Sequence, residues 1–183
     1  MKTTILQKDE PVLRKTAEAV KEAEFGTKEL LHTIEKMRTA LHSEDDGVAI
    51  AAPQIGISKR IFLVSGRTLG TLKSGKGYEE FEEEDALPDL IFINPEIQKL
   101  SRKKMLVEEG CLSVRWLYGK VSRAEKARVR ARDKNGKTFT VDSSGLLAQI
   151  FQHETDHLNG ILFIDKATDL EDLPPKTYAK QKD

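Results

Sequence analysis

Apolar residues recur at helical spacing in two stretches of the chain. In residues 28–42 they lie three or four positions apart, and Thr27 can cap the first turn. Residues 143–160 repeat this spacing; the serine pair 143–144 can cap the start, and Gly160 can adopt the left-handed conformation that ends a helix. The apolar positions of this second stretch are Leu146, Leu147, Ile150, Phe151 and Leu158. We therefore expect two helices, and we predict that the second is buried.

Two short apolar runs predict buried strands. They cover residues 60–65 and 90–95, and Pro95 is expected to end the second because proline donates no hydrogen bond to a neighbouring strand. Between them, residues 66–89 hold several glycines and an acidic run, which predicts a surface loop.

Further strands are expected in the middle of the chain. Residues 96–100 and 104–107 are predicted to pair as a hairpin. Residues 127–133 alternate apolar residues with arginines, which we interpret as the solvent face of an antiparallel strand rather than a nucleic-acid patch. Asn135-Gly136 predicts a tight turn to a partner strand at 137–141.

Composition places the chain in a broad class. Its 183 residues suit one domain, 1–183, with a charged tail at 166–183. Lysine plus arginine equal aspartate plus glutamate at 30 each, so net charge does not favour nucleic acid or an anionic membrane. No apolar run approaches the length of a membrane span, and the N-terminus lacks the apolar core of a signal peptide. Cys111 is the single cysteine, so no intramolecular disulfide can form, which fits a reducing cytoplasm.

The second predicted helix carries candidate metal ligands. His153 and His157 are four residues apart and therefore lie on one face, where both imidazoles can reach one ion. Glu154 lies beside them, close enough to reach a water without binding the metal. This is the His-Glu-x-x-His arrangement of two ligands and a general base. The alternative is a helix with two surface histidines, but an otherwise apolar helix favours a metal site.

The third ligand decides the chemistry. Phe163 stands where a third histidine would follow in one protease pattern, and no histidine occurs after His157. Asp165 or Glu171 would make a metallopeptidase site. Cys111 is the other candidate, and Gly110 before it allows a close backbone approach. A set of one cysteine and two histidines leaves an open position, which is typical of catalytic sites.

Three segments resemble the motifs of the peptide deformylase family. Residues 47–54 (GVAIAAPQ) are similar to its glycine-rich first motif, 109–113 (EGCLS) to its second and 152–157 (QHETDH) to its third. The resemblance covers about Ile5 to Asp165. It implies a mixed α+β fold in which antiparallel or mixed sheets pack around a central metal-binding helix. It also implies a hydrolase that removes the N-formyl group from the N-terminal formylmethionine of nascent polypeptides and releases formate.

The resemblance also implies residue roles. The metal ligands would be Cys111, His153 and His157, and the metal is usually Fe²⁺, replaceable by Zn²⁺, Ni²⁺ or Co²⁺. Glu154 would be the general acid and base, while the Gln54 amide and the Leu112 N–H would stabilise the anion formed from the formyl oxygen. Glu109 and Arg123 would brace the cysteine loop, and Asp156 would support the site from behind. The substrate-binding residues would be Gly47, Val48, Ala49, Gly110, Leu146 and Ile150.

Three positions depart from the family pattern. Ala49 stands where the first motif usually has its second glycine. We expect its methyl group to narrow the cleft or to shift a strand that pairs with the substrate. Arg115 and Trp116 follow the second motif, where the family often has proline and a small or polar residue. Because of the Ala49 change, a deformylase-like protein that binds metal or peptide without turnover is an alternative function. The expected partners are N-formylmethionyl nascent peptides, with transient proximity to the ribosome but no long C-terminal helix to contact it.

Overall fold

The computed structural model describes residues 3–75 and 87–174. The helices and short 3-10 turns are η1 (Pro11–Arg14), η2 (Glu22–Glu24), α1 (Lys28–His42), η3 (Ala52–Ile55), α2 (Gly66–Ser74), α3 (Gly145–Leu158) and η6 (Phe163–Asp165). The strands are β1 (Ala49–Ala51), β2 (Ile61–Val64), β3 (Leu90–Leu100), β4 (Lys104–Gly110), β5 (Leu117–Ala124), β6 (Lys126–Arg132), β7 (Thr138–Ser144) and β8 (Thr168–Asp172).

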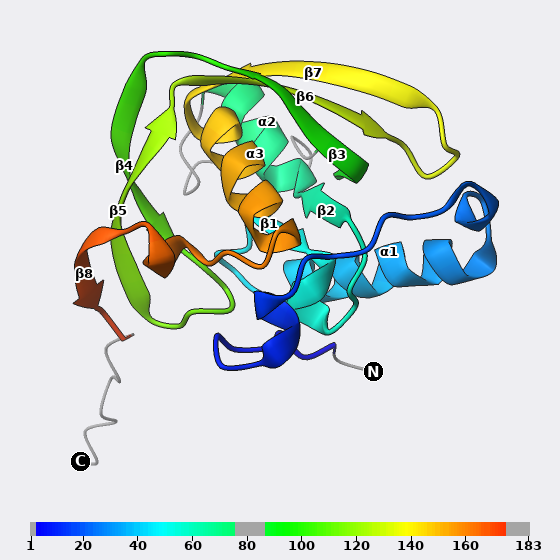
Figure 1. Cartoon of the computed structure of the whole chain (residues 1–183), viewed down its shortest axis with the longest axis horizontal. Helices are drawn as coiled ribbons and strands as arrows, with labels where there is room; N and C mark the ends of the chain where they lie inside the picture. Colours follow the sequence, from blue (N-terminus) through cyan, green and yellow to red (C-terminus); the bar gives the residue numbers. More distant parts are fainter. Residues whose placement is uncertain (1–2, 76–86, 175–183) are drawn as a thin grey trace, which may run out of the picture.

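The strands form two antiparallel sheets around α3. One has the order β1-β2-β3-β6-β7, and the other has the order β4-β5-β8. Helix α3 lies between them in the middle of the molecule and contacts strands of both (Figure 1). The expected α+β fold with antiparallel sheets around this helix is confirmed.

Strand β2 shows why the larger sheet is covered on both faces. Successive residues of a strand point to opposite faces. Phe62 and Val64 pack in the cluster that contains Phe151 of α3, whereas Ile61 and Leu63 pack in the cluster that contains α1. On the α3 side, the ring centroids of Phe62 and Phe92 are 4.5 Å apart, and those of Phe92 and Phe151 are 4.9 Å apart.

Both predicted helices form over the expected residues. The Thr27 side chain caps α1 by accepting a hydrogen bond from Leu30 N–H. Gly160 has φ +73° after α3, and a side chain there would meet the Arg14 backbone at 2.7 Å, so glycine is needed for two reasons. The predicted serine cap of α3 is wrong, since Ser144 occupies the N-cap position without a side-chain hydrogen bond to the helix.

The loop prediction for residues 66–89 is wrong over its first part. Gly66–Ser74 form α2, whose first turn is capped by Ser65 and whose end is marked by Gly75 at φ +72°. A side chain at Gly66 would overlap the Leu87 carbonyl, so this glycine permits close packing instead of breaking the helix. Residues 76–86 of the predicted loop lie outside the described residues.

Three strand predictions also need correction. Pro95 does not end β3, because it lies at an irregularity in the pairing with β6, where a missing N–H is tolerated. Residues 96–100 pair with β6, and 104–107 pair with β5, so the hairpin prediction is wrong. In the predicted charged tail, Thr168–Asp172 form β8; residues 175–183 lie outside the described residues.

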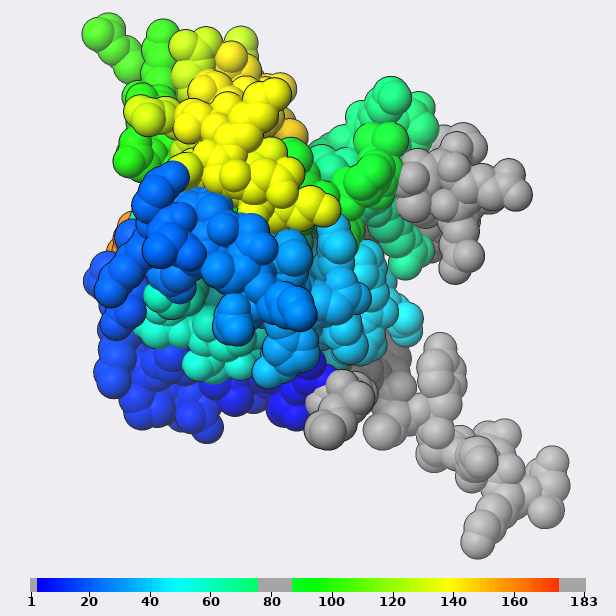
Figure 2. Space-filling view, turned by 90° about the vertical axis from the view of Figure 1, so that its right-hand side faces the viewer, coloured from blue at the N-terminus to red at the C-terminus, as the bar shows by residue number. Residues whose placement is uncertain are grey.

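The hairpin of β6 and β7 was predicted correctly. Its turn lies beside the segment that enters α1, and Figure 2 shows the hairpin and α1 next to each other on one face. Gly26 N–H donates to the Lys134 carbonyl at 3.3 Å, and the Arg132 guanidinium lies over the Phe25 ring at 4.0 Å.

No helix in the described part of the chain has the length and apolar character to span a bilayer.

Candidate metal centre and active site

Two elements bring three metal-binding side chains together. Helix α3 carries His153 and His157 one turn apart, and Cys111 follows the last residue of β4. The Sγ atom of Cys111 lies 3.2 Å from Nε2 of His157, and the donor atoms of all three residues lie within 4.8 Å of one another. Ligands bound at about 2.0–2.3 Å in a tetrahedral site are separated by about 3.5 Å, so this donor set fits a metal ion.

Gly110 lets the cysteine reach this position. A side chain at residue 110 would meet the Tyr118 ring at 2.6 Å, because this ring lies directly against the glycine backbone. Residues 110 and 118 are paired across β4 and β5. The glycine predicted for close backbone approach therefore allows the aromatic ring and the cysteine loop to share one wall of the site.

A buried ion pair supports the first histidine. Arg123 donates to Glu109 from Nε at 2.7 Å and from an Nη atom at 2.9 Å, which is a bidentate contact. Glu109 Oε2 also lies 2.9 Å from Nδ1 of His153. Burial alone would raise the pKa of Glu109, but the hydrogen bonds from Arg123 and His153 outweigh it and lower this pKa to about 2. The carboxylate is therefore ionised and can orient the imidazole so that Nε2 faces Cys111.

Further charged residues connect the Glu109–Arg123 pair to the protein surface. Arg123 donates to Asp156 at 2.6 Å, and Asp156 accepts from Lys166 at 2.7 and 2.8 Å. Positive and negative groups thus alternate from Lys166 at the surface to His153. Glu109, Arg123 and Asp156 lie behind the ligands, and their supporting role stays a prediction. The contact of Lys166 with Asp156 was not predicted.

Glu154 lines the same region of the site. It is buried, and among the described residues its Oε2 atom has no hydrogen-bond partner. Burial raises the pKa of its carboxyl group to about 7. Glu154 can thus interact with a small molecule in the pocket.

Two hydrogen-bond donors lie near the cysteine. Gln54 holds its amide oxygen at 2.8 Å from Ala51 N–H, which turns its nitrogen toward Ser113 Oγ at 3.1 Å and Cys111 Sγ at 3.6 Å. Leu112 carries the second donor. In the described part of the chain its backbone N–H has no hydrogen-bond partner, while its carbonyl accepts from the Gln7 side chain at 3.1 Å.

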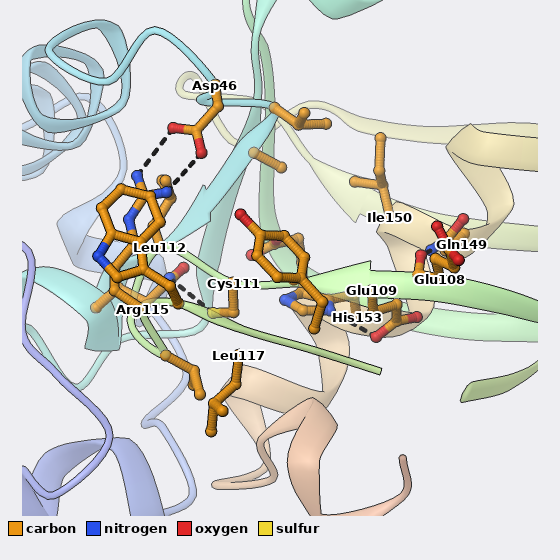
Figure 3. A pocket seen from close by; sticks show the side chains of 18 of the residues that line it. Asp46, Glu108, Glu109, Cys111, Leu112, Arg115, Leu117, Gln149, Ile150 and His153 are labelled. Atoms are coloured by element: carbon orange, nitrogen blue, oxygen red, sulfur yellow. Dashed lines mark hydrogen bonds and ion pairs between the residues drawn. The ribbon is translucent and has the colours of Figure 1, made fainter. Parts of the chain in front are cut away.

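These groups line one pocket of about 360 Å³, within the usual size of small-ligand sites (Figure 3). The predicted residues that line it are Val48, Ala49, Gln54, Glu109, Gly110, Cys111, Leu112, Leu146, Ile150, His153 and Glu154. Gly47 does not line this pocket; a side chain there would meet the Leu41 carbonyl at 2.4 Å, so close packing requires glycine, and its contact with substrate stays a prediction. The predicted residues His157 and Arg123 are not part of the pocket lining and lie behind it. Sequence reasoning missed Asp46, Glu108, Val114, Leu117, Tyr118 and Gln149.

The alternative carboxylate ligands lie elsewhere. Asp165 accepts a hydrogen bond from Arg14 at 2.6 Å and another from Leu162 N–H at 2.9 Å. Glu171 is exposed on β8. Neither belongs to the ligand cluster, so the structure favours the cysteine over a metallopeptidase carboxylate.

Comparison with known proteins identifies the family. The model of the polypeptide deformylase family matches residues 2–172. The chain belongs to this family. As a peptide deformylase it is a metal-dependent hydrolase, and its cysteine and two histidines form the metal site.

Individual relatives agree with this assignment. A peptide deformylase of Halothermothrix orenii is 43% identical over 157 residues, covering 86% of this chain and 88% of the relative. A class I type b peptide deformylase of Acinetobacter baumannii, solved with Met-Ala-Ser bound, is 32% identical with a TM-score of 0.77, covering 91% of this deformylase and 99% of that chain. A chloroplastic peptide deformylase 1B of Solanum lycopersicum is 32% identical over 180 residues, covering 97% of this chain and 58% of the relative. Relatives thus occur in more than one compartment.

Proposed function

We propose that this deformylase hydrolyses the formamide bond of N-terminal formylmethionine in newly made polypeptides and releases formate. The observation that carries the proposal is Glu154, a buried carboxyl group whose Oε2 atom has no hydrogen-bond partner among residues 3–75 and 87–174, in a pocket beside a set of three metal ligands. The Met-Ala-Ser complex of the Acinetobacter relative supports a peptide that begins with methionine as the ligand of this pocket.

The chain supplies proton transfer and anion binding. Glu154 accepts a proton from the attacking water and later delivers it to the departing amine. As water adds to the formyl carbon, its carbonyl oxygen gains negative charge. The Gln54 amide nitrogen and the Leu112 N–H then donate hydrogen bonds to that oxygen. When bound, a divalent metal lowers the pKa of water from 15.7 to about 7 and polarises the carbonyl.

The substrate peptide would lie between two strand edges. Strand β1 is an edge strand of the larger sheet, and β4 is an edge strand of the smaller one. Pocket residues lie at both edges: Val48 directly before β1, Ala49 at its first position and Gly110 at the end of β4. Leu146 and Ile150 on α3 would border the methionine side chain. The Ala49 methyl group narrows the cleft from the β1 side.

We infer that Fe²⁺ is the resident metal. One thiolate and two imidazoles suit Fe²⁺, Zn²⁺, Co²⁺ or Ni²⁺. Family resemblance favours iron among these, and we place the enzyme in a bacterial cytoplasm, where its single cysteine stays reduced. Metal analysis of anaerobically purified protein tests the assignment. The iron form should lose activity in air, and equal activity after prolonged aeration would contradict this prediction.

The decisive experiment measures formate release from formyl-Met-Ala-Ser by protein of known metal content. The Glu154→Gln variant should retain its metal and lose about 10²–10⁴-fold in kcat, the usual contribution of a general acid or base. A fully metallated parent that releases no formate would instead support the alternative of a binding protein without turnover.

A further inference from the structure

Arg115 links two segments that lie on either side of the pocket mouth. Its guanidinium donates to both carboxylate oxygens of Asp46 at 2.5 and 2.8 Å, and to Glu44 Oε2 at 3.0 Å. Asp46, Arg115 and the neighbouring Trp116 all line the pocket. Figure 3 shows Asp46 and Arg115 joined at one end, with Ile150 and Gln149 toward the other. We call the Glu44–Arg115–Asp46 contact the rim bridge.

Short turns connect the rim bridge to functional residues. Gly47 N–H donates to the Glu44 carbonyl at 3.0 Å, so both carboxylates lie on one tight turn directly before Val48. On the other side, Val114 N–H donates to the Cys111 carbonyl at 3.0 Å. A movement of Arg115 relative to Asp46 would therefore change the distance between the wall beside β1 and the loop of the cysteine ligand.

The rim bridge is stronger than an ordinary surface ion pair. The Arg115 side chain is only 17% exposed, although that of Asp46 is 55% exposed. The guanidinium also lies 4.5 Å from the centroid of the Trp116 ring. Bidentate geometry and a shared network are the conditions under which ion pairs contribute measurably. The Arg115 backbone N–H also donates to the side-chain Oε1 of Gln7 at 3.4 Å, so the N-terminal segment holds the same turn.

We propose that Arg115 is a positioning residue for the peptide substrate: the rim bridge fixes the width of the cleft between the β1 side and the cysteine loop. This inference rests on the proposed function. The polar partners of Arg115 are Gln7, Glu44 and Asp46, and the metal ligands and Glu154 are not among them, so its effect falls on peptide binding and not on proton transfer. Arg115 and Trp116 are also two of the positions at which the sequence departs from the expected family pattern.

Steady-state kinetics with formyl-Met-Ala-Ser test the proposal. Arg115→Ala should raise the KM about tenfold, the scale of one well-made charged contact, and leave kcat within about twofold. Asp46→Asn should raise the KM by a smaller factor. The double variant should be no worse than Arg115→Ala, because both changes break the same contact. Arg128→Ala is the matched control, since Arg128 makes a bidentate contact with Asp142 at 2.8 and 2.9 Å, away from the pocket.

A second measurement tests peptide binding independently of catalytic activity. Trp116 is the single tryptophan, so its fluorescence reports peptide binding without turnover. Met-Ala-Ser should bind Arg115→Ala about tenfold more weakly than the parent, at equal metal content and with a cooperative unfolding transition. An unchanged KM and peptide affinity, or a fall in kcat alone, would overturn the proposal. If the parent releases no formate, the proposed function fails, while the fluorescence titration still decides the role of Arg115.

Discussion

Glu109 and His153 face each other across the interface of β4 and α3, with Oε2 and Nδ1 2.9 Å apart. Since the carboxylate is ionised, it accepts a hydrogen bond from Nδ1–H, which leaves the Nε2 lone pair of His153 directed toward Cys111. The metal ligand is therefore oriented by a residue on the other element of the site. Arg123 holds the same carboxylate from the opposite side.

Replacing Glu109 should weaken metal binding. We expect Glu109→Gln to lower metal affinity about 10–100-fold, the usual cost of losing a carboxylate that supports a ligating histidine. Chelator competition measures this affinity. Glu108→Gln is the control, because Glu108 lies one residue earlier on β4 but is exposed, whereas Glu109 is buried against Arg123 and His153. Equal affinities for the two variants would show that Glu109 does not orient His153.

Replacing Cys111 should abolish the function. The Cys111→Ser variant exchanges an ionisable thiol for a neutral hydroxyl, so we expect metal affinity to fall by at least about 100-fold and formate release to be lost. Metal content after dialysis and formate release are the measurements. His32→Ala, which changes an exposed histidine of α1, should retain both. If Cys111→Ser kept metal and activity, a carboxylate ligand and the metallopeptidase reading would return.

Gln54 should affect the chemical step more than substrate binding. Gln54→Ala removes a donor aimed into the site, and we expect kcat to fall about 10²–10³-fold. Its amide nitrogen also contacts Ser113, so the Ser113→Ala variant separates the two effects. A similar loss of kcat in both variants would assign the effect to the Gln54–Ser113 contact and not to anion stabilisation.

Removing the buried Phe151 ring of α3, the helix that carries both histidine ligands, should destabilise the fold. Phe151 is fully buried against Phe62 and Phe92, with centroid distances of 6.1 and 4.9 Å. Phe151→Ala should reduce the free energy of unfolding by about 3–5 kcal/mol, because it removes apolar contact and leaves a cavity. Denaturant unfolding measures the loss. Phe139→Ala should cost less, since Phe139 is only half-buried at the edge of the same cluster; equal costs would contradict this account.

The parts of the site that could be predicted are those with local signals. The spacing of His153 and His157 is a property of the helix, and the cysteine motif is contiguous in sequence. The contact of Lys166 with Asp156 and the rim bridge depend on how distant segments meet, which no local pattern shows. Strand β8 was missed for a different reason: its residues are all exposed, so it lacks the alternation of apolar and polar residues by which strands are recognised.

The contribution of the rim bridge to the free energy of unfolding should depend on pH. The hydrogen bonds from Arg115 lower the pKa of Asp46 below its ordinary value of 3.8. A carboxyl group whose pKa is lower in the folded state stabilises the protein above its unfolded pKa, and this contribution is lost as the pH falls through the folded value. The difference in unfolding free energy between the parent and Asp46→Asn should therefore stay constant from neutral pH down to about 5 and shrink below pH 3.8. Denaturant unfolding over this range measures it, and a difference that already disappears between pH 7 and 5 would show that Asp46 is not held ionised by Arg115.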